Sequence, residues 1–381
     1  MINLPPAAER IQKGALVTGA IACLVTFGTI ATAQFSRSYL LAYLFWISIP
    51  LGSAALLMLY HLTGGNWGYV IRRMLEAATR TMPLMAVLFL PLLWNPKLLY
   101  EWADPNAVAG DALLQHKHAY LNVPFFIARA VVYFVIWIAL AWLLSKWSAE
   151  QDESDDPAPA RRLLAVSGPG LIVLGFTVTF AVIDWVMSLE PHWASTIYGL
   201  WFIVGMVLTT LAFMVFTARR FALVEPMDKV LQPGHFHDLG NLMLAFTMLW
   251  AYTSFSQFLI IWSGNLPEET TFYVKRMGEG WQTIAAVLVL FHFAVPFLVL
   301  LSRDIKTKME RLATLAIAML FMRMVDLFWI IRPASGGAPS LHWQDLTLPL
   351  GLGGLWVWMF LRQLKVRPMM PVYNPQGDPL F

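Results

Sequence analysis

Repeated long apolar runs most constrain the fold of this sequence. Each run reaches about the 20 residues that an α-helix needs to cross a bilayer. A backbone that crosses lipid must satisfy its own hydrogen bonds, and continuous rather than alternating apolar runs favour helices. Only 13% of residues are charged, about half the usual share of a soluble domain. The predicted spans are residues 14–34, 39–62, 79–96, 122–145, 163–187, 194–217, 237–263, 280–302, 309–331 and 346–364.

These runs predict an all-α integral membrane protein with about ten transmembrane helices, in which residues 1–381 form a single polytopic domain. Residues 14–145 hold spans 1–4, and residues 163–364 hold spans 5–10. Between them we predict an acidic cytoplasmic linker at residues 146–162. Residues 365–381 contain four prolines and no helical period, which predicts an extended cytoplasmic tail.

The positive charges set the predicted orientation. Of the 26 Lys and Arg residues, eighteen lie at loops and helix edges on the side of the N-terminus, six lie on the other side, and two lie inside spans. Because cytoplasmic loops carry an excess of Lys and Arg, this asymmetry places both termini in the cytoplasm. Since the basic residues sit at helix ends, the net charge of +3 gives no reason to expect a nucleic-acid partner.

Ionisable residues inside the spans are the main functional candidates, because each costs about 3 kcal/mol at a helix centre on insertion scales. With this orientation, Arg129, Asp184, Arg323 and Asp326 gather in the outer half of the membrane, and Glu190 and His192 lie in the outer loop after span 5. Arg323 and Asp326 are spaced to pair on one helix face, and Arg129 is the expected counter-ion of Asp184.

A second set of polar residues lies toward the cytoplasm and at the middle of the membrane. The inner members are His61, Glu76, His237 and Asp238, and His292 lies in mid-span. Span 7 is polar through its middle, with Tyr252, Ser254 and Gln257 among the residues expected to face protein or water. Two interpretations remain open for each residue: a pair that fixes neighbouring helices, or a member of a proton path.

Redox metals are not expected in this chain. Cys23 is the single cysteine, and no C-x-x-C-H haem-attachment sequence occurs. A Cys-ligated iron–sulfur cluster and covalent haem are therefore excluded. We expect no catalytic residue, no metal site and no covalently bound cofactor, and leave a quinone or a lipid open as a ligand.

Three motifs carry a family resemblance. They are YHLTGGNWGYVIRRMLEAATRTMPL (60–84), DWVMSLEPHWASTIYG (184–199) and GHFHDLGNLMLAFTMLWAYTSFSQFLIIWSGNLPEE (234–269). The chain resembles the F subunits (ActF) of alternative complex III, a bacterial quinol:cytochrome c oxidoreductase, within the NrfD/polysulfide-reductase-like family. The stretch LFWISIPLGSAALLMLYH (44–61) lacks the early-span His motif of the sister C subunit, which favours the F type.

The resemblance implies two four-helix bundles, spans 2–5 and 6–9, flanked by spans 1 and 10, in the bacterial inner membrane. It implies a subunit of the respiratory chain with no redox centre of its own. Haem and iron–sulfur clusters would sit in partners: a quinone-site membrane subunit, an iron–sulfur subunit, cytochrome c subunits and a terminal oxidase.

The family's proton path maps most readily onto His61, Asp184, His292 and Asp326, with Glu190 and His192 at its outer end and Arg129 and Arg323 as modulators. Two alternatives remain. One is a quinone-binding subunit with a lipid-facing aromatic pocket near Trp185, Trp193 and Trp250, and the other is a stand-alone transporter.

Overall fold

The computed structural model describes residues 6–153 and 156–370 and is almost entirely helical, with no strand in that part of the chain. Eight helices within it are long and apolar enough to cross a membrane, and one bent helix pair makes a ninth if it counts as one span. The prediction of an all-helical fold with several helices long and apolar enough to cross a membrane is therefore confirmed for the described residues.

The helices match the predicted runs in order, with shifted boundaries. They are α1 (Pro6–Phe27), α2 (Ala33–Thr63), α3 (Asn66–Thr79), α4 (Met82–Trp94), α7 (Val123–Glu153), α8 (Ala158–Trp185), α9 (Tyr198–Phe221), α11 (Pro233–Gly264), α13 (Trp281–Val287), η4 (Leu288–Ala294), α14 (Val295–Leu301), α16 (Met309–Ile331) and α17 (Gln344–Leu364). Helix α17, the predicted tenth span, is not among the eight; its ends carry Gln344, Asp345, Arg362 and Gln363, which are strongly polar.

The third predicted span differs most. Residues 79–96 were expected to form it, but the structure has α3 and α4 joined at a 42° bend. Helix α3 was not predicted as part of a span because charged residues are costly in lipid. Its main charged residues are Arg72, Arg73 and Glu76. In the fold all three side chains are buried against protein, and α3 begins at Asn66, shortly after α2 ends at Thr63.

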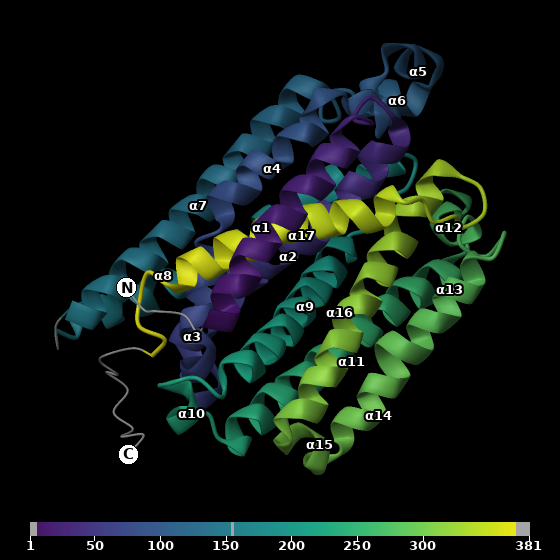
Figure 1. The fold of residues 1–381 in the computed structure, drawn as a ribbon. Coiled ribbons are helices and arrows are strands. Elements are labelled where there is room, and N and C mark those ends of the chain that lie inside the picture. Colours follow the sequence, from purple (N-terminus) through teal and green to yellow (C-terminus); the bar gives the residue numbers. More distant parts are fainter. Residues whose placement is uncertain (1–5, 154–155, 371–381) are drawn as a thin grey trace.

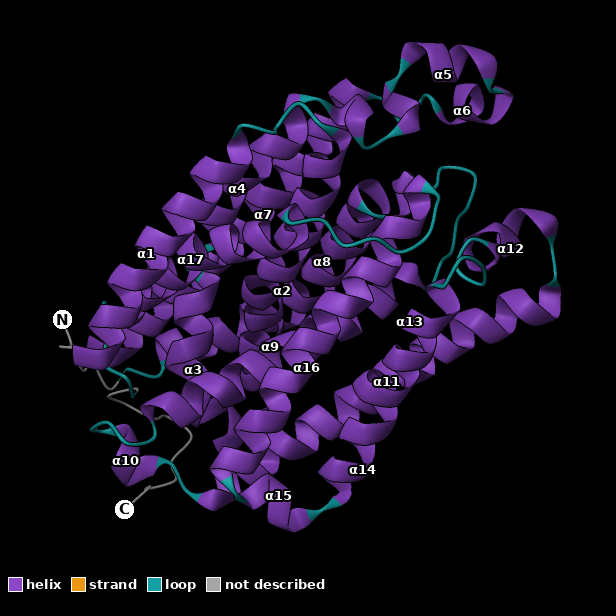
Figure 2. Ribbon diagram, turned by 45° about the vertical axis from the view of Figure 1, so that its right-hand side comes forward, coloured by secondary structure: helices purple, strands orange, loops and turns teal. Residues whose placement is uncertain are grey.

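Two groups of helices pack around α2 and α9 (Figures 1 and 2). Helix α2 contacts α4 and α8, and α7 contacts both α4 and α8. In the second group α9 contacts α11 and α16, and the segment from η4 to α14 lies against α11. Contacts of α9 with α2 and α8 join the groups. Residues of α2 are buried almost throughout, so this helix is the central element of the fold.

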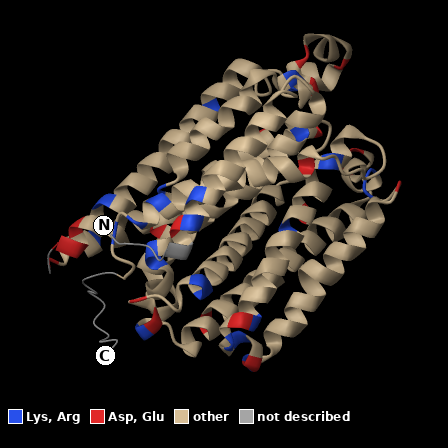
Figure 3. Cartoon of the chain, in the orientation of Figure 1, with Lys and Arg blue, Asp and Glu red and all other residues tan. Residues whose placement is uncertain are grey.

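The molecule has two distinct ends. The start of α1 and the end of α17 lie toward the end that holds α3, α10 (Met227–Val230) and α15 (Arg303–Thr307). The short helices α5 (Pro105–Gly110), α6 (Ala112–Lys117) and α12 (Pro267–Val274) lie at the opposite end. Charged residues gather mainly at the ends, and few lie along the middle of the helices (Figure 3).

The predicted linker is shorter than expected. Helix α7 continues to Glu153 and α8 begins at Ala158, so most of residues 146–162 is helical. Arg73 explains the extension, because it pairs with Asp152 in the last turn of α7. Residues 154–155 lie outside the described part of the chain, as do residues 371–381 of the predicted extended tail.

Glycines bring α1 and α17 into close contact. A Cβ atom at Gly19 would lie 2.8 Å from the Leu355 nitrogen and 3.0 Å from the Gly351 oxygen, and one at Gly354 would meet the Ala15 oxygen. Small residues of this kind let two helix backbones approach each other in membranes, where packing rather than hydrophobicity drives association. Helix α1, which is otherwise largely exposed, is held to the protein by this contact.

Replacing Gly19 with Leu is expected to lower the free energy of unfolding by about 1–3 kcal/mol, the usual cost of overpacking. Gly14 is the matched control, because nothing lies within 4 Å of a Cβ atom there. Both changes alter helix propensity equally, so the difference reports the contact. Thermal unfolding in detergent measures it, and equal midpoints for Gly14→Leu and Gly19→Leu would contradict the packing argument.

Candidate functional site

Asp184 lies at the end of α8 and is completely buried. Its two carboxylate oxygens accept hydrogen bonds from Arg129 of α7, at 2.8 Å from Nε and 2.9 Å from Nη2, and Tyr133 donates a third at 2.7 Å. The expected Arg129–Asp184 pair is therefore present, in the bidentate geometry that makes such pairs strong. Tyr133 was not predicted, although it stands one turn after Arg129 on the same helix.

The Arg129 guanidinium is enclosed on its other side as well. It stacks on the Tyr120 ring at 3.8 Å and on Phe125 at 4.3 Å, and Nη1 donates to the Tyr120 carbonyl at 2.9 Å. Three of the roughly four acceptor positions of the Asp184 carboxylate are thus occupied by donors from α7. The arrangement therefore favours a fixed ion pair that holds α7 to α8.

Glu190, which the sequence analysis places in the loop after span 5 at the outer end of the expected path, is buried. One of its oxygens lies 2.8 Å from Nη2 of Arg276, and the other lies 3.2 Å from Nζ of Lys275. Arg276, which looked like an ordinary loop residue, is buried itself and donates to the carbonyls of Trp329 and Ile330 at the end of α16. Burial lowers the pKa of the Arg276 guanidinium, and Glu190 opposes that shift.

His192 lies in the loop between α8 and α9, half exposed, and its Nε2 is 2.6 Å from Oδ2 of Asp111. Asp111 also caps α6 by accepting from the amides of Leu113 and Leu114. The Leu114 amide, together with the His192 ring, holds the pKa of Asp111 below its usual value. This pair joins two outer loops and does not contact the Asp184 site within the described residues.

A different arrangement occurs in the second group of helices. Arg323 and Asp326 pair within α16 and are both buried, as is His292 of η4. Five polar atoms of these residues have no hydrogen-bond partner in the described part of the chain: Nε and Nη2 of Arg323, Oδ1 of Asp326 and both ring nitrogens of His292. We call these three residues the His292–Asp326 cluster. Buried polar groups are normally satisfied by protein or ordered water.

Trp250 of α11 connects the members of this cluster. Its ring meets the His292 ring edge-on, with centroids 4.4 Å apart, and it approaches the Asp326 carboxylate without reaching hydrogen-bonding geometry. Gly205 of α9 leaves room for the Arg323 guanidinium, which a Cβ atom there would meet. His292 sits in a π-helical turn, a feature that often accompanies functional sites.

An apolar cavity of about 660 Å³ opens beside the cluster, between α11, η4 and α16. Its lining includes Trp201, Trp250, Ser254, Asp326 and Trp329. The three indole nitrogens and the Ser254 hydroxyl have no hydrogen-bond partner among the described residues. Pockets of this size, mostly apolar with a few polar groups, are typical of small-molecule sites. Of the three tryptophans expected at a ligand pocket, Trp185 and Trp193 lie elsewhere.

The other polar residues of span 7 divide between two environments. Tyr252 is 67% exposed and lies at the edge of the cavity beside Trp250. Gln257 is buried and accepts a hydrogen bond from Ser195 at 2.5 Å, which fixes the outer loop to α11. Both residues lie on the same helix as Ser254 but take no part in the His292–Asp326 cluster.

The inner residues form separate groups. His61, at the end of α2, has an enclosed Nε2 without a partner in residues 6–153 and 156–370. Glu76 is fully buried among four arginines of α3 and the C-terminal segment: Arg72, Arg73, Arg80 and Arg367. His237 and Asp238 lie at the start of α11, with His237 Nδ1 3.7 Å from an Asp238 oxygen. The predicted path residues are therefore not brought into one continuous chain.

No group of three or more potential metal ligands occurs among the described residues. No protein-family model matches the sequence, and no curated protein matches it significantly.

Proposed function

We propose that this chain is a membrane subunit of a respiratory quinol:cytochrome c oxidoreductase of the alternative complex III type, in which it provides part of a proton path and a scaffold. In this proposal it crosses the bacterial inner membrane ten times, with both termini in the cytoplasm. Spans 2–5 and 6–9 form two bundles, and α1 and α17 flank them. The helix contacts and the resemblance of its three motifs support this layout.

The observation that carries the proton-path proposal is the His292–Asp326 cluster. Three ionisable side chains from two helices are buried together, and five of their polar atoms lack a partner in the described part of the chain. Leaving such atoms unsatisfied costs about 1–3 kcal/mol each, so the site is expected to bind ordered water. A histidine and a carboxylate joined by water are the groups that carry protons in membrane proteins.

Asp184 and Glu190 have a different role in this proposal. Asp184 accepts two hydrogen bonds from Arg129, and Glu190 forms an ion pair with Arg276, which also donates to the Ile330 carbonyl. In this proposal both pairs mainly fix helix ends. His61 faces the cytoplasmic side and stands as a separate candidate for proton uptake.

The test is Asp326→Asn in the assembled complex, purified through a tag on this chain and placed in vesicles. The tag is expected to bring down haem-bearing and cluster-bearing subunits. Electron transfer should continue, while proton release per electron falls by roughly half or more, because an amide cannot relay a proton.

Asp345→Asn is the matched control. Asp345 is also a buried acid, but its oxygens accept from the Ser38 hydroxyl at 2.6 Å and the His342 amide at 2.9 Å. It should leave the proton yield unchanged. Two results would contradict the proposal: an unaltered proton yield in an assembled Asp326→Asn complex, or a chain that purifies without redox partners.

The cavity beside Trp250 supports a second candidate function, quinone binding by this chain. Its unpartnered indole N–H groups could donate to a quinone carbonyl, and its exposed apolar rim suits an isoprenoid tail. Trp250→Phe separates the two functions, because it removes one donor and no titrating group. A raised KM for quinol with normal proton yield would favour quinone binding.

A further inference from the structure

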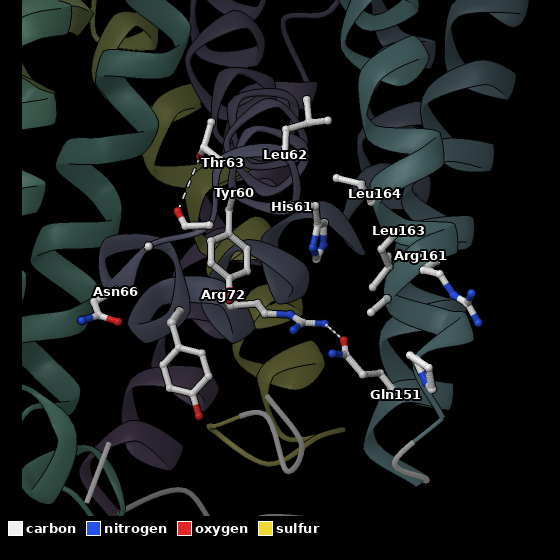
Figure 4. Close-up of a pocket in the computed structure, with 15 residues that line it drawn as sticks. Tyr60, His61, Leu62, Thr63, Asn66, Arg72, Gln151, Arg161, Leu163 and Leu164 are labelled. Atoms are coloured by element: carbon white, nitrogen blue, oxygen red, sulfur yellow. Dashed lines mark hydrogen bonds between the residues drawn. The ribbon is translucent and has the colours of Figure 1, made fainter. Parts of the chain in front are cut away.

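A second cavity, of about 570 Å³, lies at the end of the molecule that holds α3 and α10 (Figures 1 and 4). Its walls come from the end of α2, the start of α3, the end of α7 and the start of α8. The residues that decide its chemistry are Tyr60, His61, Gly65, Arg72, Arg161 and Leu164. It is separate from the His292–Asp326 cluster and from the cavity beside Trp250.

Positive charge dominates this cavity. Arg72 is buried in its wall, where it donates to Gln151 at 2.7 Å (Figure 4), and Arg161 lies at its rim without an ion pair in the described residues. No Asp or Glu in residues 6–153 and 156–370 lines the cavity. Behind Arg72 stand three further arginines around Glu76, and among the described residues Asp152 is the other acid paired with them. Four cations facing two acids leave an excess of positive charge.

Free hydrogen-bond donors face the same space. Helix α3 has fourteen residues and starts after Gly65 with no side-chain cap, so its first amides remain available. Gly64 and Gly65 have φ values of 68° and 100°, a left-handed conformation that favours glycine. The enclosed Nε2 of His61 also has no partner in the described chain, and Figure 4 shows the ring between Arg72 and Leu164. Uncapped helix N-termini with nearby cations bind phosphate groups.

One side of the cavity is apolar and open. Leu62 and Leu164 are 41% and 48% exposed, and they continue the lipid-facing surfaces of α2 and α8. Lipid chains could lie along these leucines while a headgroup enters the polar half. Basic pockets between transmembrane helices on the cytoplasmic side are known to hold anionic lipid headgroups.

We infer that this cavity binds the phosphate of an anionic phospholipid headgroup, between Arg72, Arg161 and the start of α3, with an acyl chain against Leu62 and Leu164. The inference does not depend on the proposed function. A lipid could bind here in a transporter or in a respiratory subunit, and loss of lipid binding would leave the proton-yield test unaffected.

The test uses the full chain in detergent and measures lipid retention by native mass spectrometry with added phosphatidylglycerol. Arg161→Glu is the test variant. Arg162→Glu is the matched control, because it makes the same charge change one residue away, where Arg162 pairs with Glu150 at 3.0 Å outside the cavity. Arg161→Glu is expected to weaken phosphatidylglycerol binding by about tenfold or more, and Arg162→Glu by less than about threefold.

Two further measurements fix the ligand. Phosphatidylcholine should bind more weakly than phosphatidylglycerol, and millimolar inorganic phosphate should not displace the lipid. Equal losses in the two arginine variants would overturn the inference, as would equal binding of the two lipids. Displacement by inorganic phosphate, with the same dependence on Arg161, would assign the cavity to a soluble phosphate and overturn the lipid assignment. Thermal unfolding of both variants checks that they are folded.

Discussion

Glu76→Gln is expected to lower the free energy of unfolding by about 3–5 kcal/mol, the usual loss when one partner of a buried ionic network is removed. The Glu76 carboxylate lies 3.0 Å from Nε of Arg72 and 2.8 Å from Nη1 of Arg73, and it accepts a hydrogen bond from Ser148 at 2.6 Å. Arg80 and Arg367 also lie within 4 Å. Without the negative charge, four guanidinium groups would remain in one buried site.

Glu150→Gln is the control for this prediction. Glu150 is one-third exposed and pairs with Arg162 and Lys146, so its loss should cost no more than about 1 kcal/mol. Denaturation in mixed micelles would measure both changes. A second substitution, Arg367→Gln, should restore part of the stability of Glu76→Gln because it removes one unbalanced cation. Similar free energies of unfolding for the Glu76 and Glu150 variants would show that the ion pairs of Glu76 with its four arginines contribute little to the stability of the fold.

The sequence predicted the helical class and most helix positions, because long apolar runs have few alternatives in lipid. It missed α3, since the charges of Arg72, Arg73 and Glu76 look incompatible with a buried helix until their mutual pairing is known. The extension of α7 to Glu153 has the same cause, because Asp152 is fixed by Arg73, far away in sequence. Local patterns cannot reveal ion pairs between distant segments.

The candidate sites show the same limit. Pairing of Arg129 with Asp184 could be predicted because their helices are consecutive and both charges lie near the outer end. The pairing of Glu190 with Arg276 could not be predicted, because the two loops are far apart in the sequence and only the tertiary structure brings them together. The sequence pattern did not predict the π-helical turn at His292. Which polar atoms of the His292–Asp326 cluster lack a hydrogen-bond partner depends on side-chain geometry, which a sequence pattern does not show.

Arg129→Met is expected to cost about 3–5 kcal/mol, because it leaves the fully buried Asp184 carboxylate without its guanidinium. A methionine can still fill the space over the Tyr120 and Phe125 rings, so the loss should report charge rather than volume. The double variant Arg129→Met/Asp184→Leu should recover most of this stability, since apolar replacement of a buried ion pair is often nearly neutral. All variants of the cycle should also carry Tyr133→Phe. The Tyr133 hydroxyl donates to Asp184, and it would lose its acceptor in the variants that replace Asp184 with Leu.

The double-mutant cycle therefore separates pairing from proton transfer at the outer end of the first helix group. Non-additivity of a few kcal/mol in the unfolding free energies would measure the coupling of Arg129 and Asp184 directly. If Asp184 only holds α7 to α8, the stable double variant should assemble and keep its full proton yield per electron. A normal rate of electron transfer with a reduced proton yield would instead make Asp184 a proton carrier. Additive losses would show that the bidentate contact, despite its 2.8 and 2.9 Å distances, contributes little to holding the helices together.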